Sequence, residues 1–453
     1  MAVIVGMGAG WLVGSARAAD PQFPPLAYPL PQPMPELVPP LASWTIIPRS
    51  QASVPLGTVV PGDAPSMKDA ARADAVALAG YGYVEEEYLV SGSLRNADGD
   101  TPYTTRILVR RPADPNNFGG TVQIEPLSGG SERGFAWDWA WPYMVADKDV
   151  WVGITVSQDD AAGMLRKFDA QRYAGVKIPS AAGWEDILVQ VAWAMRAPDG
   201  LLAKLHFDDK AATVPGLFKI YASGWGDTGC LLRDFVDGGR AGRSRTPAGR
   251  PVIDAYILGE CPGAAPIHAP ADIAILQIAS ESAYRTPEQA AATAAARQPD
   301  IDLPKGRYRW YDVAGAVIAP CPAPAGHAPG MQYFLRALLA DLDQWLRVGG
   351  HAPAGAVLEL DADHRIKRDE NGNALGGVRS YWVDVPTATV GARDSDGRCG
   401  ESVVPFDKAQ TARLYKDRAD YVTKLTDDLI KLVNGNYMRA ADSDQVISEA
   451  TFQ

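Results

Sequence analysis

The chain has 453 residues, of which 47% are hydrophobic and 21% charged, a composition typical of folded globular proteins with a sizeable core. Its 43 basic and 54 acidic residues give a net charge of −11, which repels a phosphate backbone and argues against nucleic acid and anionic membrane surfaces as partners. The 44 glycines and 36 prolines predict long loops.

The N-terminus has the pattern of an export signal. A mostly apolar stretch over residues 2–14 is followed by the small-residue cleavage pattern Ala16-Arg17-Ala18. The stretch is too short to span a bilayer as a helix. It therefore predicts a signal peptide over residues 1–18, a mature chain starting at Ala19, and a periplasmic or secreted protein. No other stretch approaches the length of a membrane span, so we expect none in the mature protein.

A proline-rich arm is expected next. Residues 21–40 contain nine prolines, which remove amide donors and favour polyproline II over helix or sheet. Such a segment is either a ligand for a partner or a spacer or strap laid on the main domain. The predicted organisation is a signal peptide at 1–18, a Pro-rich N-terminal arm at 19–66 and a main domain at 67–453.

The main domain alternates strand-like and helix-like segments, which predicts a largely parallel sheet covered by helices. The expected strands are 83–91, 104–111, 121–127, 151–157, 217–222, 252–258, 273–279 and 308–313. The expected helices are 184–196, 230–236, 331–347 and 408–433.

Two motifs within these segments call for an interpretation. The aromatic tract at 135–141 would spread its rings around a helix or gather them on one face of a strand, and it either lines a ligand pocket or packs a cap on the core. Glu85-Glu86-Glu87 predicts a solvated strand edge, because neighbouring strand residues point to opposite faces and cannot share a metal.

A glycine-rich turn follows the strand at 217–222 and precedes the helix at 230–236. It reads Gly224-Trp225-Gly226-Asp227-Thr228-Gly229. A strand, a tight turn and a helix form the nucleophile elbow, in which small residues let a catalytic side chain sit at a strained position above the sheet. The glycine pattern by itself has low specificity, because any tight strand-to-helix crossover tolerates it.

The surrounding sequence makes the pattern more specific. The stretches YGYVEEEYLVSG (from Tyr81), RILVRRPADPNNFGGTVQIE (from Arg106), WVGITVSQ (from Trp151), GWGDTGCLLRDF (from Gly224), GNALGGVRSYWVDVPTAT (from Gly372) and VPFDKAQTARLY (from Val404) carry a resemblance. Together they resemble the α/β-hydrolase-domain family of bacterial, often exported, esterase-like proteins, over roughly residues 67 to 440. The resemblance implies an α/β-hydrolase fold with cap-like insertions and, for typical members, serine-dependent cleavage of a carboxyl ester.

The family's catalytic roles map onto this chain with substitutions. The elbow of the family resembles G-x-S-Q-S/T-G, which places the serine position at Gly226. The acid stretch reads Ser280-Glu281-Ser282-Ala283, so Glu281 is retained as the acid while the aspartate position is Ala283. The histidine position is Ile318. The resemblance therefore implies a degenerate hydrolase that binds a small ester or carboxylic acid.

A rearranged active site is the alternative. Asp227 or Cys230 would be the nucleophile, Glu281 the acid and His327 the base. Each of these residues also has a structural interpretation: Asp227 as a helix cap, Cys230 as half of a disulfide with Cys261 or Cys321, and His327 as a surface side chain.

The remaining site features are the cysteines and the turn after the strand at 121–127. Ser128-Gly129-Gly130-Ser131 stands where this fold supplies an oxyanion-hole amide, and Trp225 and Asp227 flank the same predicted pocket. Four cysteines, Cys230, Cys261, Cys321 and Cys399, permit up to two disulfides in three connectivities, or buried thiols. They lack zinc-finger spacing, so we expect no metal and no cofactor.

Overall fold

The computed structural model describes residues 35–48, 50, 78–95, 99–127, 132, 134–157, 161–179, 183–204, 218–261, 263, 265–303, 306–317, 331–391 and 403–450. The predicted signal peptide lies outside the described residues. So do the following predicted site residues and cysteines: Ser128, Gly129, Gly130, Ile318, Cys321, His327 and Cys399.

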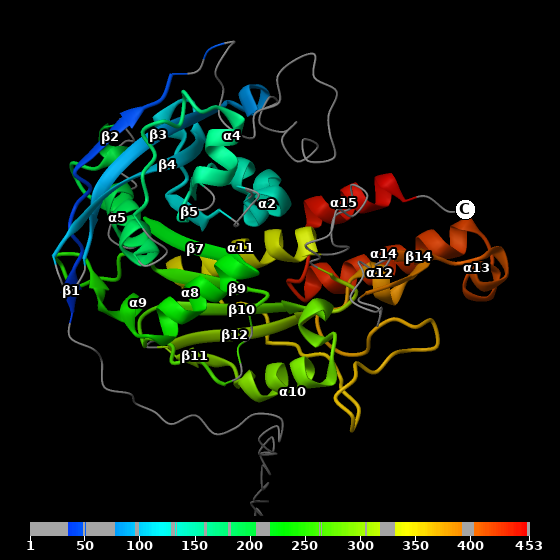
Figure 1. Ribbon diagram of the computed structural model, residues 1–453. Coiled ribbons are helices and arrows are strands. Elements are labelled where there is room, and N and C mark those ends of the chain that lie inside the picture. Colours follow the sequence, from blue (N-terminus) through cyan, green and yellow to red (C-terminus); the bar gives the residue numbers. More distant parts are fainter. Residues whose placement is uncertain are drawn as a thin grey trace, which may run out of the picture.

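A ten-stranded sheet forms the centre of the protein (Figure 1). In spatial order its strands are β11 (Ile301–Leu303), β12 (Gly306–Val313), β10 (Ala274–Ser280), β9 (Ala255–Gly259), β7 (Lys219–Trp225), β5 (Thr121–Pro126), β6 (Val150–Ile154), β4 (Thr101–Pro112), β3 (Tyr83–Leu94) and β2 (Ser43–Ile46). The strands from β12 to β6 are parallel, and the outer pairs are antiparallel. The carboxyl ends of the parallel strands therefore meet at one edge, where open α/β sheets bind ligands.

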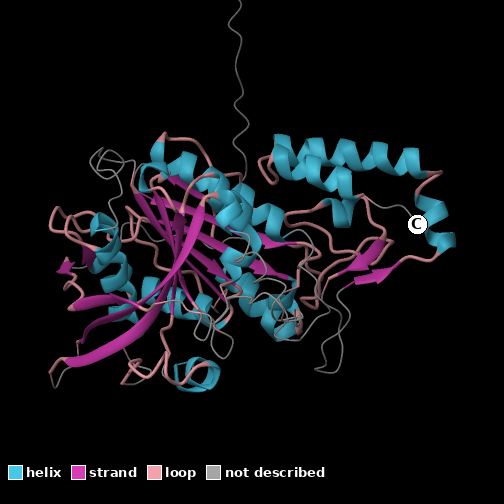
Figure 2. Ribbon diagram, turned by 90° about the horizontal axis from the view of Figure 1, so that it is seen from above, coloured by secondary structure: helices cyan, strands magenta, loops and turns pink. Residues whose placement is uncertain are grey.

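Helices cover both faces of this sheet, as Figure 2 shows from above. The helices α5 (Trp184–Arg196) and α8 (Asp227–Asp237) share one apolar cluster with one face, whereas α2 (Phe135–Ala146) and α11 (Met331–Arg347) share another with the opposite face. Because side chains alternate along a strand, β7 serves both clusters, with Ala222 in the first and Trp225 in the second. The structure confirms the predicted fold class.

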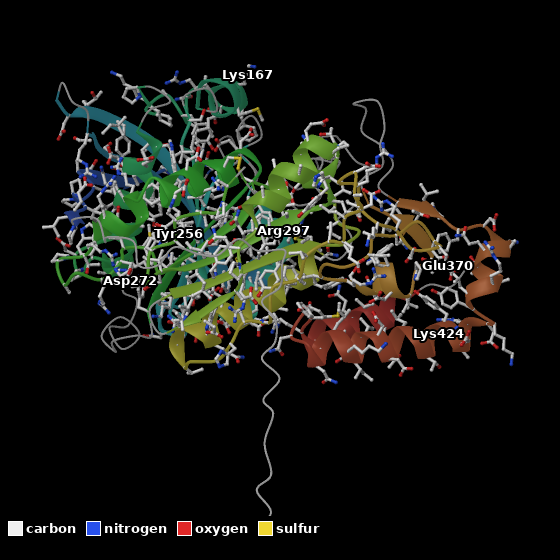
Figure 3. All side chains as sticks on the ribbon, turned by 90° about the horizontal axis from the view of Figure 1, so that it is seen from below. Lys167, Tyr256, Asp272, Arg297, Glu370 and Lys424 are labelled. Atoms are coloured by element: carbon white, nitrogen blue, oxygen red, sulfur yellow. A yellow bond between two sulfur atoms is a disulfide. The ribbon has the colours of Figure 1, made fainter. Side chains whose placement is uncertain are left out.

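The C-terminal elements lie beside the end of the sheet rather than on its faces (Figure 1). They comprise α12 (Tyr381–Asp384), α13 (Lys408–Leu414), α14 (Arg418–Asn434), α15 (Ala440–Glu449) and the two-stranded ribbon of β13 (Ala388–Val390) and β14 (Val403–Pro405). Figure 3 shows Glu370 and Lys424 in this region, away from Tyr256 and Arg297. The predicted helix at 408–433 is in fact two helices, because Asp417 has extended backbone and its side chain caps α14 by accepting from Asp420 N.

The short elements are β1 (Glu36–Leu37), β8 (Ser244–Arg245), α4 (Arg166–Phe168), α6 (Leu201–Lys204), α9 (Arg240–Arg243), α10 (Pro287–Ala296), the 3₁₀ turns η2 (Leu78–Tyr81), η3 (Pro115–Asn117) and η5 (Glu281–Tyr284), and the π turn η4 (Ala161–Leu165). Among the described residues, no helix has the length and apolarity needed to cross a membrane.

The described part of the N-terminal arm is a strap. Its first strand, β1, pairs with β8, and β2 adds an antiparallel edge strand to β3. The sheet therefore includes residues that the sequence assigned to the arm.

The prediction of a solvated edge for the run of three glutamates on β3 was wrong. Glu87 is 1% exposed and its carboxylate accepts from Arg106 Nε and Arg172 Nε, each over 2.6 Å. Glu85 pairs with Arg110 Nε over 3.0 Å, and Glu86 pairs with Arg111. The cations come from the neighbouring strand and from a segment 85 residues away, which the local pattern of β3 cannot reveal.

Candidate active site

Gly226 forms the turn between β7 and α8 at the carboxyl edge of the sheet. Its backbone has φ 60° and ψ −121°, a conformation that residues with a side chain adopt only under strain. Its amide donates to Gly259 O over 3.1 Å, which fixes the turn against the end of β9. A Cβ built on Gly226 meets no heavy atom within 4 Å, so the position has the strain and the open space of a nucleophile elbow.

The two flanking glycines lack this space. A Cβ on Gly224 would lie 2.5 Å from Thr228 O, and one on Gly229 would lie 2.0 Å from Gly259 O. Both glycines are therefore required by close backbone contacts, whereas at Gly226 the glycine relieves backbone strain only. Gly226 is thus the one glycine of the three at which a side chain would have room.

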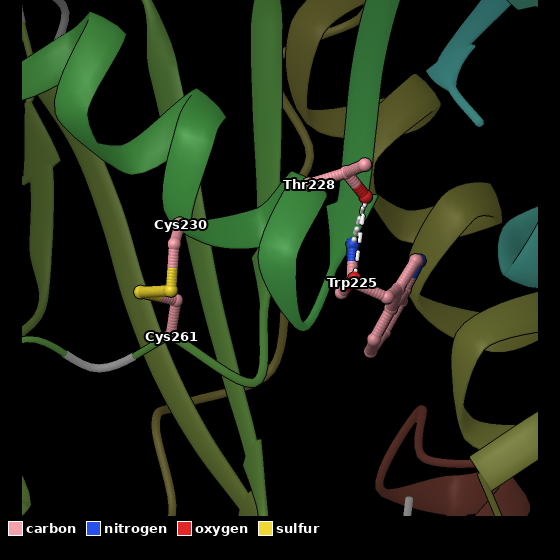
Figure 4. Close-up of a disulfide and its surroundings, with 4 residues drawn as sticks. All are labelled: Trp225, Thr228, Cys230 and Cys261. Atoms are coloured by element: carbon pink, nitrogen blue, oxygen red, sulfur yellow. Dashed lines mark hydrogen bonds between the residues drawn. A yellow bond between two sulfur atoms is a disulfide. The ribbon is translucent and has the colours of Figure 1, made fainter. Parts of the chain in front are cut away.

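Asp227 is the first residue of α8 and its side chain is exposed. It was expected to cap the helix, but the N-cap is Gly226 and no side-chain cap bond is formed. An acidic residue in the first turn still interacts favourably with the helix dipole. The neighbouring Thr228 stabilises the turn, because its hydroxyl accepts from Trp225 N over 3.0 Å and donates to Trp225 O over 3.2 Å (Figure 4).

Cys230 is bonded to Cys261 in a disulfide that joins the first turn of α8 to the loop after β9 (Figure 4). The sequence left Cys261 and Cys321 open as partners, and the structure decides for Cys261. A disulfide-bonded sulfur cannot ionise to a thiolate, which is the nucleophilic form of cysteine. The hypothesis of a Cys230 nucleophile is therefore incompatible with this bond. The disulfide instead ties the elbow helix to the neighbouring strand.

Glu281 follows β10 at the same edge of the sheet and is fully buried. Its carboxylate accepts from Gly315 N and from Arg368 Nη2, each over 2.8 Å. Gly391 packs so closely that a Cβ there would lie 2.3 Å from Glu281 Oε2. Glu281 thus lies directly after β10, and its described partners include a guanidinium that the sequence analysis did not identify.

Glu260 is a second carboxyl group between the elbow and Glu281, and sequence reasoning missed it. It follows Gly259 on β9, is partly buried, and has a left-handed backbone with φ 58°. Oε1 accepts from Ser280 N over 2.5 Å, and burial raises the Glu260 pKa to about 7. Its only sequence signal is its place after an apolar strand.

Two buried glutamates flank the predicted oxyanion turn at 128–131, which itself lies outside the described residues. Glu125 at the end of β5 accepts from Ala136 N over 2.8 Å and Trp151 Nε1 over 3.1 Å, and burial raises its pKa to about 8. Glu132 accepts from Arg106 Nη1 over 3.1 Å and from Thr155 Oγ1 over 2.6 Å. The described segments that contain Glu125 and Glu132 are therefore tied to the core.

The aromatic tract at 135–141 belongs to helix α2, and its buried rings pack within the core. Trp137 lies 5.4 Å from Trp151, and Trp139 meets Trp225 edge-on at 4.7 Å, measured between ring centroids. Trp225 is only 1% exposed, so its ring supports the elbow from beneath the surface. These contacts favour the packing interpretation over the ligand-lining one.

The described residues contain no group of three or more His, Cys, Asp or Glu side chains placed to hold a metal ion.

Comparison with known proteins gives a family match. A family model described as an alpha/beta hydrolase domain matches residues 40–317 and 318–448. No curated protein matches the chain at a significant level.

The solved structures to which the chain is similar include hydrolases. A dienelactone hydrolase from Anabaena variabilis is 14% identical over 57% of this chain and 95% of its own, with a TM-score of 0.29. One of two fungal esterases from Rhizomucor miehei is 13% identical over 66% and 94%, with a TM-score of 0.33. The feruloyl esterase module from Clostridium thermocellum is 11% identical over 49% and 79%, with a TM-score of 0.27.

Proposed function

The chain belongs to the alpha/beta hydrolase domain family, and on that premise we propose that it is an exported, esterase-like member that has lost the catalytic serine and histidine. It binds a small ester or carboxylic acid at the carboxyl edge of the sheet and does not form an acyl-enzyme there.

The backbone of Gly226 carries this proposal. The turn keeps the strained conformation that presents a nucleophile and the space above it, but glycine supplies no attacking atom. In serine proteases, loss of the nucleophile or the histidine lowers turnover by about a million-fold, leaving about a thousand-fold from oxyanion stabilisation and positioning. Binding is the function that such a site retains.

The surroundings of Glu281 support the loss of the base. In a working triad the acid orients a histidine, yet Glu281 has an arginine, Arg368, on its carboxylate and Ile318 stands at the histidine position in the sequence. An arginine does not give up its proton at physiological pH, so it cannot take over as the base.

Hydrolysis of a panel of short-chain p-nitrophenyl esters tests the proposal. We expect no turnover by the mature protein and measurable turnover by the double variant Gly226→Ser, Ile318→His. The matched control is Gly226→Ala, Ile318→His, which has the same backbone strain and histidine but no hydroxyl. Equal rates for the two double variants would show that Gly226 is not the nucleophile position.

Turnover by the unmodified protein would favour the alternative instead. Asp227 is exposed beside the elbow and is the remaining candidate nucleophile, with Glu281 and His327 as its partners. In that case Asp227→Asn would abolish the activity and Gly226→Ala would leave a measurable rate. The proposal of a vacated site would then be wrong.

Export is supported by the Cys230–Cys261 disulfide, because such bonds persist in oxidising compartments. Expression with the full N-terminus in a bacterial host, followed by fractionation and mass measurement, tests this. We expect the protein outside the cytoplasm with Ala19 as its first residue. A cytoplasmic protein that retains residues 1–18 would contradict export.

A further inference from the structure

Glu260 occupies the gap between the elbow and the acid. Strand β9 lies between β7 and β10, so its carboxyl end separates Gly226 from Glu281. Gly259 accepts the hydrogen bond from the elbow amide, and the next residue along the chain is Glu260. Its side chain reaches over the end of β10, where Ser280 N donates to it. In a triad, a base has to stand between nucleophile and acid.

The chain holds Glu260 in this place against a conformational preference. Its φ of 58° is unfavourable for a residue with a side chain, and such strain concentrates at functional sites. Two contacts fix it: Glu260 N donates to Ile278 O over 2.9 Å, and Cys261 is held by the disulfide to α8. Ser280 holds the carboxyl group twice, because its backbone amide donates to Oε1 over 2.5 Å and its side chain forms a second hydrogen bond. Glu260 nevertheless stays partly exposed at the edge of the sheet, where a ligand can contact it.

The charged groups around Glu260 come from several elements. Burial makes the largest contribution to its raised pKa, and the two hydrogen bonds from Ser280 act against it. Asp312 on β12 raises the pKa further, while Arg285 after η5 lowers it. Glu281 follows Ser280 on β10, and on α8 the Arg233 guanidinium lies against Gly263 in the loop that follows Glu260. The net result is a carboxyl group that exchanges its proton near neutral pH.

We propose that Glu260 is the ligand-binding proton donor of this site and that it selects a carboxylate ligand over the corresponding ester. The inference rests on the proposed binding function. A protonated Glu260 donates its O–H to a ligand carboxylate, and hydrogen bonds to an ionised acceptor are roughly twice as strong as those to a neutral one. Once ionised, Glu260 loses this donor and repels the carboxylate but not an ester.

Calorimetric titration of the mature protein with butyrate and with methyl butyrate, between pH 5.5 and 8.5, tests the inference. The butyrate affinity should fall by about tenfold per pH unit above about pH 7, because the binding-competent form loses one proton. The methyl butyrate affinity should change by about tenfold or less in total and then level off, because only a neutral hydrogen bond is lost.

The variant Glu260→Gln keeps a donor at every pH, so its butyrate affinity should be independent of pH. Glu370→Gln, the same change on an exposed loop, should leave the wild-type pH profile intact. If Glu260→Gln fails to fold, the wild-type profiles for the two probes still decide the matter.

The outcomes separate the inference from the function on which it rests. A pH-independent butyrate affinity of the wild type, or preference for methyl butyrate at pH 5.5, would overturn the role of Glu260 while leaving a binding site. Hydrolysis of methyl butyrate would overturn the proposed function. Absence of binding to both probes over the whole pH range would overturn both.

Discussion

Arg368 Nη2 donates to Glu281 Oε2 over 2.8 Å, which pairs the carboxylate that follows β10 with a guanidinium from a segment 87 residues further along the chain. The Glu281 side chain is fully buried, whereas that of Arg368 is 31% exposed. The ion pair thus joins a buried carboxylate to a partly exposed guanidinium at the carboxyl edge of the sheet.

Removal of this guanidinium should destabilise the protein. The variant Arg368→Met leaves the buried carboxylate with one cation fewer, and we expect a loss of about 1–3 kcal/mol in the free energy of unfolding, below the 3–5 kcal/mol of fully buried pairs because Arg368 is partly exposed. Urea unfolding at pH 7 measures it. The control is Lys367→Met, whose pair with Glu359 is exposed and whose loss should be below about 0.5 kcal/mol. Equal effects of the two variants would contradict the prediction.

A side chain at the elbow should cost stability through strain alone. Gly226→Ala meets no neighbour but retains φ 60°, so we expect a loss of about 1–3 kcal/mol. Gly224→Ala should cost more, because its Cβ would collide with Thr228 O. Gly80→Ala, at an open position with ordinary φ, is the control and should change stability little. Chemical unfolding of the three variants measures the free energy of unfolding and ranks them by stability. A Gly226→Ala variant as stable as Gly80→Ala would argue against backbone strain at Gly226.

The disulfide should contribute substantially to stability. Cys230 and Cys261 are 31 residues apart, and a closed loop of that length stabilises a folded chain by about 3–4 kcal/mol in the chain-entropy model. The double variant Cys230→Ala, Cys261→Ala should therefore unfold at a lower urea concentration than the wild type. An unchanged unfolding midpoint would mean that the bond does not form in the purified protein.

The pH dependence of stability should contain a contribution from Asp341 on α11. Its side chain is 8% exposed, Oδ2 has no hydrogen-bond partner among the described residues, and burial raises its pKa to about 7. A raised carboxyl pKa means that the folded state holds the proton more tightly than the unfolded state. The contribution of Asp341 to stability is therefore greatest below about pH 4 and falls as the pH rises towards 7, by at most about 1.4 kcal/mol per pH unit.

The variant Asp341→Asn removes this titration. Its stability relative to the wild type should rise between about pH 4 and pH 7 and stay constant above, as measured by urea unfolding across that range. Asp363→Asn, at an exposed loop position, is the control and should follow the wild-type curve. A constant difference between Asp341→Asn and the wild type at all pH values would show that Asp341 has an ordinary pKa.

The order of residues along the chain was enough to predict the class of fold, a glycine-rich turn between a strand and a helix, and the bounds of two covering helices. The predicted helices at 184–196 and 331–347 coincide with α5 and α11, because their apolar residues recur at the spacing of one buried helical face. The turn around Gly226 was recognisable because a strand, closely spaced glycines and a helix follow one another along the chain. These features depend on residues that are close together in the sequence, and so they can be predicted from it.

The pairing of the charged groups, and the set of carboxyl groups that share the edge of the sheet, became visible only in the folded protein. The partners of Glu87 and Glu281 come from segments far away along the chain, and Glu260 stands between the elbow and the acid because β9 lies between β7 and β10. The alternation of apolar and polar side chains along a strand indicates which face is buried. It does not indicate which other strand lies beside it. Pairing across strands and burial of charge arise when the sheet forms, and for that reason they were absent from, or wrong in, the prediction.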